Sequence, residues 1–441
     1  MTLLSALLIA TAFPLEAAHA EEGPTAMAES GTLRVPVQER ASATREISPV
    51  ADLEFSCSPS TVDRELCVSV GVPSGQEEAS ASASNAGAEQ QPEMRRESAV
   101  RASESELACS TGQLDYAYDR FNSCLGNFPV HITETKDGKP VGTALMQVTA
   151  QMSLKQNSLT WKENIQIKYL EAAGNLTTTT FGISFAASCD KTCSMTAASP
   201  WAGEQSIRPG QTISGDVTFG VGTPNSGWNG GITTQYQMRF SQAGTIPLQP
   251  NTSWTNPQKI RCDDEVDGTA GCVYPHVKPN LELPLSKYGE AAATYLFQQQ
   301  YSTHAWGTQE EPLHRLANEQ AQQDNRDRTC VVAAEGTLDT PELFVRKSST
   351  IPDDSCDEYP FAASMEGGTP GAFCNDVEFE LVDGEWIYHN ANPSKPWTEE
   401  APCSRGHVPF ELNRNAGGEL GRLVKSQRII DLDGYTVNIT E

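Results

Sequence analysis

The stretch that decides the fold runs from Asp137 to Tyr169 and reads DGKPVGTALMQVTAQMSLKQNSLTWKENIQIKY. Its opening Asp-Gly pair is the strongest short signal for a β-hairpin turn. A first apolar run follows, with Leu145, Val148 and Ala150. In a second run Ile165, Ile167 and Tyr169 recur at every second position, the period of a strand with one buried face. The stretch therefore predicts antiparallel strands.

The same pattern extends on both sides and predicts an antiparallel β-sandwich over residues 107–300. Further strand-like segments are separated by clusters of Gly, Pro, Asn and Ser, the spacing typical of a sandwich. They are Thr177–Phe185, Gly215–Val221 and Thr233–Phe240. Trp161, Trp201 and Trp228 could bind sugar, but packing in the core or at its rim is the favoured interpretation.

The chain ahead of this region contains an export signal and a polar leader. Residues 3–10 are apolar and Ala18-His19-Ala20 is a small-residue cleavage site, which predicts a signal peptide over 1–20 and a secreted, extracellular protein. Residues 21–106 include an Ala-Ser repeat over 79–84 and a charged run without apolar period, and so predict a disordered acidic leader. No segment predicts stable membrane association.

Twelve cysteines support an oxidising compartment. No Cys-x-x-Cys pair is present, so zinc binding is disfavoured and disulfide bonds are expected. Eight cysteines fall as neighbouring pairs: Cys57/Cys67, Cys109/Cys124, Cys189/Cys193 and Cys262/Cys272. The pairing of Cys330, Cys356, Cys374 and Cys403 stays open.

Composition limits how the protein could meet a polyanion. Across 441 residues, 57 acidic residues against 31 basic ones give a net charge of −26. Residues 329–441 alone hold 8 Lys/Arg and 20 Asp/Glu, a net charge of −12 (8 minus 20). A generally basic surface is excluded, which leaves a local basic patch or a bound cation as the route to phosphate.

Helical signals begin near residue 288. Tyr288–Gln300 is Ala-rich, and Pro312–Asn325 places Leu313, Leu316 and Ala317 on one face. We therefore expect a helical connector over 301–328. His314 lies beside that face and is interpreted as a structural histidine.

Unusual polar residues concentrate in the last 113 residues. A strand at Thr329–Val332 precedes Asp357 and Glu358, which lie beside Cys356 and before Pro360, and Glu366 precedes a Gly pair. Carboxylates of this kind bind hard cations or accept protons, although Asp and Glu next to Pro are also ordinary loop residues. A hairpin is expected around Asp383-Gly384.

A basic helix face follows. Asn413 is a suitable N-cap for a helix that ends near Arg428. Its basic residues, Arg414, Arg422, Lys425 and Arg428, lie within an arc of roughly 120° at 100° per residue. This face either contacts phosphate or is simply solvated.

The order of these parts resembles the NucA/NucB-type deoxyribonucleases over residues 329–441. The resemblance is carried by Cys-Asp-Glu-Tyr-Pro-Phe-Ala from Cys356, Glu-Gly-Gly from Glu366, Asn-Arg-x-Ala-Gly from Asn413, and an Asp-Gly pair before a terminal strand. It implies an α+β, ββα-metal-like nuclease domain. The whole chain is then multidomain, a secreted DNA endonuclease that hydrolyses phosphodiester bonds without sequence specificity.

The resemblance also implies roles for individual residues. Asp357 would be the general base, and Asn413 would help to hold a divalent cation, with Glu366 and Glu358 as further support. Oxygen ligands point to Mg²⁺ or Mn²⁺. The DNA-binding candidates on the helix are Arg414, Asn415, Arg422 and Lys425.

Two features depart from the family pattern. The stretch from Gly368 to Cys403 is longer than in compact members, so the substrate cleft is expected to be reshaped. Arg405-Gly406-His407 resembles the Arg-Gly-His of nucleases with a histidine base, so His407 is a further catalytic candidate, although structural support is favoured. The alternatives for the whole chain are an extracellular binding or adhesion protein with an inactive nuclease-like domain, and a secreted nuclease toxin.

Overall fold

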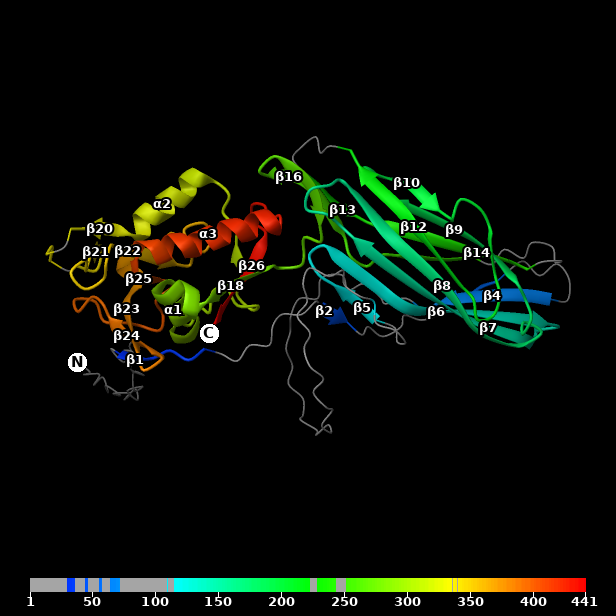
Figure 1. Ribbon diagram of the computed structural model, residues 1–441, viewed down its shortest axis with the longest axis horizontal. Helices are drawn as coiled ribbons and strands as arrows, with labels where there is room; N and C mark the ends of the chain where they lie inside the picture. Colours follow the sequence, from blue (N-terminus) through cyan, green and yellow to red (C-terminus); the bar gives the residue numbers. More distant parts are fainter. Residues whose placement is uncertain are drawn as a thin grey trace, which may run out of the picture.

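The computed structural model describes residues 30–35, 44–46, 55–57, 64–71, 109, 115–222, 228–242, 251–334, 336–338 and 340–441. These residues form a β-rich body, on the right in Figure 1, and a mixed body of helices and sheets on the left. The expected multidomain, β-rich architecture is confirmed. The predicted signal peptide and the Ala-Ser repeat lie outside the described residues.

The β-rich body has a large antiparallel sheet of order β10-β12-β8-β7-β6-β4-β3, in which β5 also pairs with β6 and β2 pairs with β5. Its strands are β2 (Thr44–Glu46), β3 (Phe55–Cys57), β4 (Arg64–Val70), β5 (Asp115–Tyr118), β6 (Asn122–Lys136), β7 (Lys139–Ser153), β8 (Thr160–Gly174), β10 (Cys193–Ser199) and β12 (Thr212–Val221). A smaller sheet has the order β11-β9-β14-β15, formed by β9 (Phe181–Cys189), β11 (Gln205–Ile207), β14 (Thr234–Gln242) and β15 (Asn251–Thr255).

Alternation of side chains along the strands builds one core between these sheets. In β8 the buried positions are every second residue from Trp161 to Tyr169, and they include the predicted Ile165, Ile167 and Tyr169. Phe128 of β6 meets Trp254 of β15 across the core, with ring centroids 5.0 Å apart. Trp161 and Trp201 are buried in this core, which bears out the packing interpretation over sugar binding. The side chain of Trp228 lies outside the described residues.

The register of β7 differs from the expected one. Its inward positions are Met146, Val148, Ala150 and Met152, whereas Leu145 is only half-buried on the opposite face. The predicted turn is confirmed, because Asp137 and Gly138 both have positive φ between β6 and β7.

A short sheet of order β13-β16-β17 leads from the β-rich body toward the mixed body. Its strands are β13 (Trp228–Ile232), β16 (Ile260–Val266) and β17 (Thr269–Val273). The Cys262–Cys272 disulfide joins β16 to β17.

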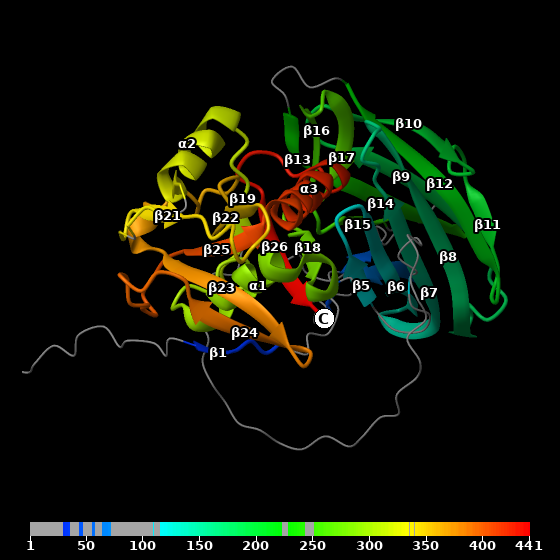
Figure 2. The same cartoon turned by 60° about the vertical axis from the view of Figure 1, so that its left-hand side comes forward.

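The mixed body is built on a sheet of order β1-β24-β23-β25-β22, and a second sheet of order β18-β26-β19 (Figure 2). These strands are β1 (Ser30–Thr32), β18 (Asn280–Pro284), β19 (Leu313–His314), β22 (Asp354–Tyr359), β23 (Asn375–Val382), β24 (Glu385–Asn390), β25 (Ser404–Pro409) and β26 (Gly434–Thr440). The remaining elements are α1 (Leu285–Tyr301), α2 (Glu319–Thr329), β20 (Val331–Ala333), β21 (Leu343–Val345), a 3-10 turn η1 (Gly371–Phe373) and α3 (Phe410–Ser426).

Helix α1 is the centre of the second core. Tyr288, Tyr295 and Phe297 are almost completely buried against both sheets. Gly406 of β25 allows this packing, because a Cβ there would lie 2.0 Å from the Thr294 hydroxyl oxygen. Residues 280–301 therefore pack with the C-terminal chain, although the sequence analysis assigned 107–300 to the sandwich.

Several local expectations are wrong. The leader prediction over 21–106 fails for β1, which pairs with β24, and for β4, which pairs with β6 and buries Leu66 and Val68. The segment expected to be helical from residue 312 begins with strand β19, and α2 starts only at Glu319, capped by Asn318. Helix α3 starts at Phe410, so Asn413 lies inside its first turn.

All twelve cysteines lie within the described ranges and are paired. The four neighbouring pairs form as expected, and the open set resolves into Cys330–Cys356 and Cys374–Cys403. Such pairing fits a secreted, disulfide-bonded protein. Among the helices that the structure describes, none has the length and apolar character needed to cross a membrane.

Candidate active site

A cleft of about 950 Å³ lies where α2, β22 and α3 come together, and we call it the central cleft. Val266 and Asp267, at the end of the β16–β17 hairpin, form part of its wall, so the β-rich body contributes to it. The polar side chains that line it are Asp267, Tyr295, Arg315, Glu319, Gln322, Arg326, Asp327, Arg346, Ser355, Asp357, Glu358, Asn413, Lys425 and Tyr435.

Strand pairing places the predicted carboxylates against helix α3. Asp357 lies opposite Gly406 in the antiparallel β22–β25 pair, and β25 runs directly into α3. Asn413, one turn into that helix, donates through Nδ2 to the Cys356 carbonyl at 3.0 Å and to the Ser355 hydroxyl at 3.2 Å. Among the described residues no group donates a hydrogen bond to the side-chain oxygen of Asn413, which remains an acceptor at the cleft.

Asp357 is only 4% exposed. One of its oxygens, Oδ2, accepts a hydrogen bond of 2.9 Å from the Tyr295 hydroxyl, and no described side chain donates to the other. Burial, reinforced by the neighbouring charge of Glu358, raises the pKa of Asp357 well above its ordinary value, and the Tyr295 bond partly offsets this. A cation in the cleft would favour the ionised form.

Glu358 is the second carboxylate at the cleft floor, and it is 8% exposed. Burial raises its pKa to about 7, while the Arg326 guanidinium opposes that shift. The two groups approach to 3.8 Å between Glu358 Oε1 and Arg326 Nε. Asp357 and Glu358 therefore form a buried acidic pair, with the Arg326 guanidinium beside Glu358.

Four positively charged side chains line the same cleft. Arg315, Arg326, Arg346 and Lys425 all line the cleft and come from different segments of the chain. Lys425, on α3, also forms a 3.0 Å ion pair with Asp267 of the β16–β17 turn. The cleft thus combines oxygen ligands with several anion-binding groups.

Glu366 and His407, two of the predicted site residues, do not line the central cleft. Glu366 accepts hydrogen bonds from the backbone N–H of His314 at 2.9 Å and lies 2.7 Å from its Nδ1. His407 is buried, bonded through Nδ1 to Asp354 at 2.7 Å and stacked on Phe344 at 4.1 Å between ring centroids. These contacts give both residues structural positions.

The predicted basic face of α3 is divided. Lys425 reaches the central cleft, whereas Arg414 and Asn415 are exposed outside it and Arg422 pairs with Glu419. Arg428 is 1% exposed and lies beyond the helix, where it binds Asp263 and donates to the Gln156 carbonyl at 2.7 Å. Of the basic residues placed on one arc, only Lys425 therefore lines the cleft.

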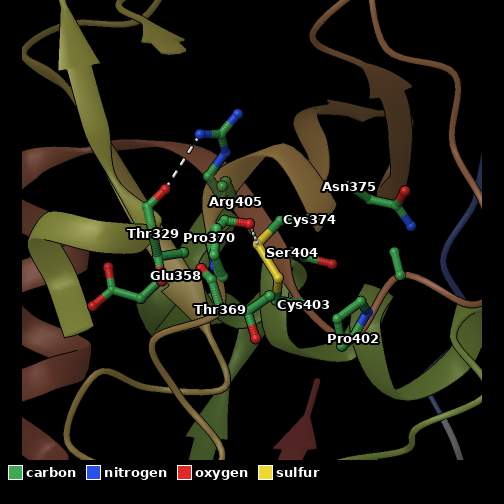
Figure 3. The surroundings of a disulfide bond; sticks show 12 residues. Thr329, Glu358, Thr369, Pro370, Cys374, Asn375, Pro402, Cys403, Ser404 and Arg405 are labelled. Atoms are coloured by element: carbon green, nitrogen blue, oxygen red, sulfur yellow. Dashed lines mark hydrogen bonds between the residues drawn. A yellow bond between two sulfur atoms is a disulfide. The ribbon is translucent and has the colours of Figure 1, made fainter. Parts of the chain in front are cut away.

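The Cys374–Cys403 disulfide lies near Arg405, Thr329 and the cleft residue Glu358 (Figure 3). Arg405 donates to both oxygens of Asp376, at 2.6 and 2.8 Å, and to the Thr329 carbonyl at the end of α2, at 3.2 Å. This arginine ties β25 to β23 and to α2. It was noted in the sequence only as part of an Arg-Gly-His motif.

Other cleft residues were missed altogether. Tyr295, Arg315, Arg326 and Arg346 are spread over 52 positions and belong to no motif. Only the acidic pair and Asn413 carried a local sequence signal. The Ala-rich pattern of α1 predicted a helix but gave no indication that Tyr295 would reach Asp357.

Two clusters of three Cys, His, Asp or Glu donors occur in the part of the chain that the structure describes, Cys57/Glu65/Cys67 in the β-rich body and Cys330/Cys356/Glu358 at the central cleft. Both contain a disulfide, whose sulfurs offer no thiolate. The Asp357, Glu358 and Asn413 oxygens instead suit a hard cation such as Mg²⁺ or Mn²⁺ that keeps several waters.

Comparison with known proteins gives no family assignment. No family model matches the sequence, and no curated protein matches it. Among solved structures, the GAE domain of GGA2p from Saccharomyces cerevisiae matches with 12% identity and a TM-score of 0.19, over 25% of this chain and 86% of that one. Salmonella alpha-2-macroglobulin reacted with methylamine matches with 11% identity and a TM-score of 0.17, over 30% of this chain and 8% of that one. At such scores these similarities assign no function.

Proposed function

We propose that this chain is a secreted, divalent-cation-dependent deoxyribonuclease that cuts DNA without sequence specificity. One observation carries the proposal: a buried Asp-Glu pair and the free side-chain oxygen of Asn413 line one cleft together with four cationic side chains. The resemblance of residues 329–441 to NucA/NucB-type deoxyribonucleases supports the same chemistry, and the paired cysteines support export.

Asp357 is the proposed general base. Its unbonded oxygen is available to accept a proton from the water that attacks phosphorus, while Tyr295 holds the other oxygen and fixes the carboxylate orientation. Asn413 is fixed in the same way, because its amide hydrogens are held by β22. Glu358 is the second carboxylate beside the base.

The oxygens of Asn413, Glu358 and Asp357 fit a divalent cation, which when bound would stabilise negative charge on the phosphate and on the leaving oxygen. Arg326, next to Glu358, would bind a non-bridging phosphate oxygen. Arg315, Arg346 and Lys425 would hold neighbouring phosphates, contacts that carry no sequence information. Non-specific cleavage follows from this set.

Cleavage of supercoiled plasmid and of single-stranded DNA by the full-length exported chain tests the proposal. Wild type should nick with Mg²⁺ or Mn²⁺ and stop with chelator, and Asp357→Asn and Asn413→Ala should each lose at least about 100-fold in rate. Asn415→Ala is the matched control, because this exposed asparagine lies on the same helix outside the cleft. Full-rate cutting by Asp357→Asn would refute the base assignment. DNA binding without any cutting by wild type would favour an inactive binding protein.

A further inference from the structure

We propose that the central cleft takes an unpaired DNA strand, and that Phe410 stacks on one of its bases. This inference rests on the proposed nuclease function and names the form of the substrate. It is drawn from the depth of the acidic pair, from the exposed aromatic ring at the cleft edge, and from the charges around both.

The acidic pair lies too deep for a duplex to reach easily. Asp357 and Glu358 are 4% and 8% exposed, at the floor of a space of about 950 Å³. A space of this size matches a pocket for a small ligand, roughly 300 to 1,000 Å³, and so holds a few nucleotides. A rigid duplex is too wide to enter a pocket of this size, since its major groove alone spans about 12 Å. A single strand can bend its phosphate down to the carboxylates.

Phe410 offers a base-stacking surface at the right place. It is the first residue of α3, lines the cleft, and is 57% exposed, although large aromatic side chains are normally buried. It stands three residues before Asn413, so the two side chains lie on the same helix face. A base stacked on Phe410 would therefore sit next to the phosphate held near Asn413. In a duplex the bases are already stacked on each other, so no base face is available to stack on the Phe410 ring.

The charge around the cleft suits a thin polyanion together with a cation. The four cationic side chains face five carboxylates, those of Asp267, Glu319, Asp327, Asp357 and Glu358. Such a balanced lining offers separate anion contacts instead of one broad basic face. The backbone of a single DNA strand can bend so that its phosphates reach each of these contacts. Recognition by backbone charge together with aromatic stacking is the usual mode for unpaired nucleic acid.

Fluorescence anisotropy of the full-length Asp357→Asn protein with Mg²⁺ tests this inference. The probes are a 5′-labelled 15-nucleotide oligothymidylate and a labelled hairpin duplex of equal length. We expect the single strand to bind at least about 10-fold more tightly than the duplex. Phe410→Ala and Phe410→Leu should weaken single-strand binding by about 10-fold, whereas Phe410→Tyr should retain it. Phe373→Ala is the matched control, because Phe373 is 64% exposed on η1 and lies outside the cleft.

Equal affinity for both probes, or unchanged single-strand binding by Phe410→Ala, would overturn the inference. Either result leaves the nuclease proposal standing if wild type nicks plasmid. Conversely, Phe410-dependent binding of the single strand by a wild-type protein that never cuts would refute the nuclease and keep the binding mode. The two failures are therefore distinguishable.

Discussion

Replacing Glu163 by glutamine should stabilise the β-rich body at pH 8 and flatten its dependence on pH. Glu163 lies on β8, is 1% exposed, and contacts the Tyr236 hydroxyl across the core. Burial, only partly offset by that contact, raises its pKa from 4.5 to about 8. The same hydroxyl lies 2.6 Å from the Thr234 oxygen. Since the hydroxyl has one proton, both contacts are satisfied when Glu163 is protonated and donates to Tyr236.

The sign follows from proton linkage. Below pH 4.5 the group is protonated in both the folded and the unfolded states, so it costs nothing. As the pH rises from 4.5 to 8 the unfolded state releases the proton and the folded state keeps it, so the free energy of unfolding falls. At about 1.36 kcal/mol per pKa unit, the raised pKa costs on the order of 3 to 4 kcal/mol between pH 5 and pH 8.

Urea denaturation at pH 5 and pH 8, followed by tryptophan fluorescence, measures the effect. Trp161, Trp201 and Trp254 are buried in this core and report on its unfolding. Glutamine cannot ionise, and its amide can donate to Tyr236 as the protonated acid does, so the pH-dependent loss should largely disappear. Glu134→Gln is the control, because Glu134 is equally buried in the same sheet but is paired with Arg64. That variant should keep the wild-type fall above pH 5. A Glu163→Gln protein that falls as steeply as wild type would refute the reasoning.

Three further outcomes are expected. The isolated fragment 329–441 should aggregate or lack a cooperative melting transition by circular dichroism, because it lacks β18 and α1, and a soluble, cooperatively melting fragment would contradict the core described above. Arg428→Ala should lower the free energy of unfolding by about 3 kcal/mol in urea, since it leaves buried Asp263 short of a partner, and a change below about 1 kcal/mol would argue against that network. Lys425→Gln should reduce the slope of log K against log salt for single-strand binding by about 0.7, the value for one lost phosphate contact, whereas Arg414→Gln, outside the cleft, should leave it unchanged.

Local patterns in the sequence predicted the elements whose signals are short-range. The Asp-Gly turns form as expected between β6 and β7 and between β23 and β24, because both turn residues must adopt positive φ. The alternation of Ile165, Ile167 and Tyr169 predicted the buried face of β8 over those residues. Helix α1 was found from its Ala-rich stretch, since good helix formers need no tertiary information.

Long-range contacts were beyond such patterns. Strand β4 was assigned to the leader, yet it forms a hairpin with β3 and pairs with β6, whose partner residues lie 60 or more positions later in the chain. Arg428 continues the helical arc of basic residues, yet the helix ends at Ser426 and Arg428, with φ of 48°, turns into the β-rich body. Its apparent role on a phosphate-binding face was therefore wrong.

For the candidate site, the sequence identified the residues with acid-base and cation-binding chemistry but not the residues that line the cleft around them. Asp357, Glu358 and Asn413 stood out because the separate stretches that contain them together resemble the NucA/NucB-type pattern, and the structure brings all three to one cleft. Glu366 belonged to the same motif but is held by His314. The arginines around the acidic pair come from separate segments, so only the folded chain brings them together.

Arg428 is part of a hydrogen-bond network that joins the β-rich body to the mixed body. Its carbonyl oxygen accepts from Arg261 at 2.8 Å and from Arg120 at 3.1 Å, and both arginines also bind Asp433. Since Arg120 and Arg261 belong to the β-rich body and Asp433 to the mixed body, this buried network fixes the β16–β17 turn against α3.

The contact between the β16–β17 turn and α3 affects how this acidic protein would bind DNA. The turn carries Asp267, which pairs with Lys425 at the cleft edge, so the β-rich body both closes the cleft and occupies one of its cations. A phosphate must compete with Asp267 for Lys425, and such exposed pairs are weak, about 0 to 1 kcal/mol. A strand already bound at the acidic pair through a cation can therefore displace Asp267 from Lys425 readily. A strand that contacts only the surface displaces it much less readily. The net charge of −26 would thus restrict binding to the cleft instead of preventing it.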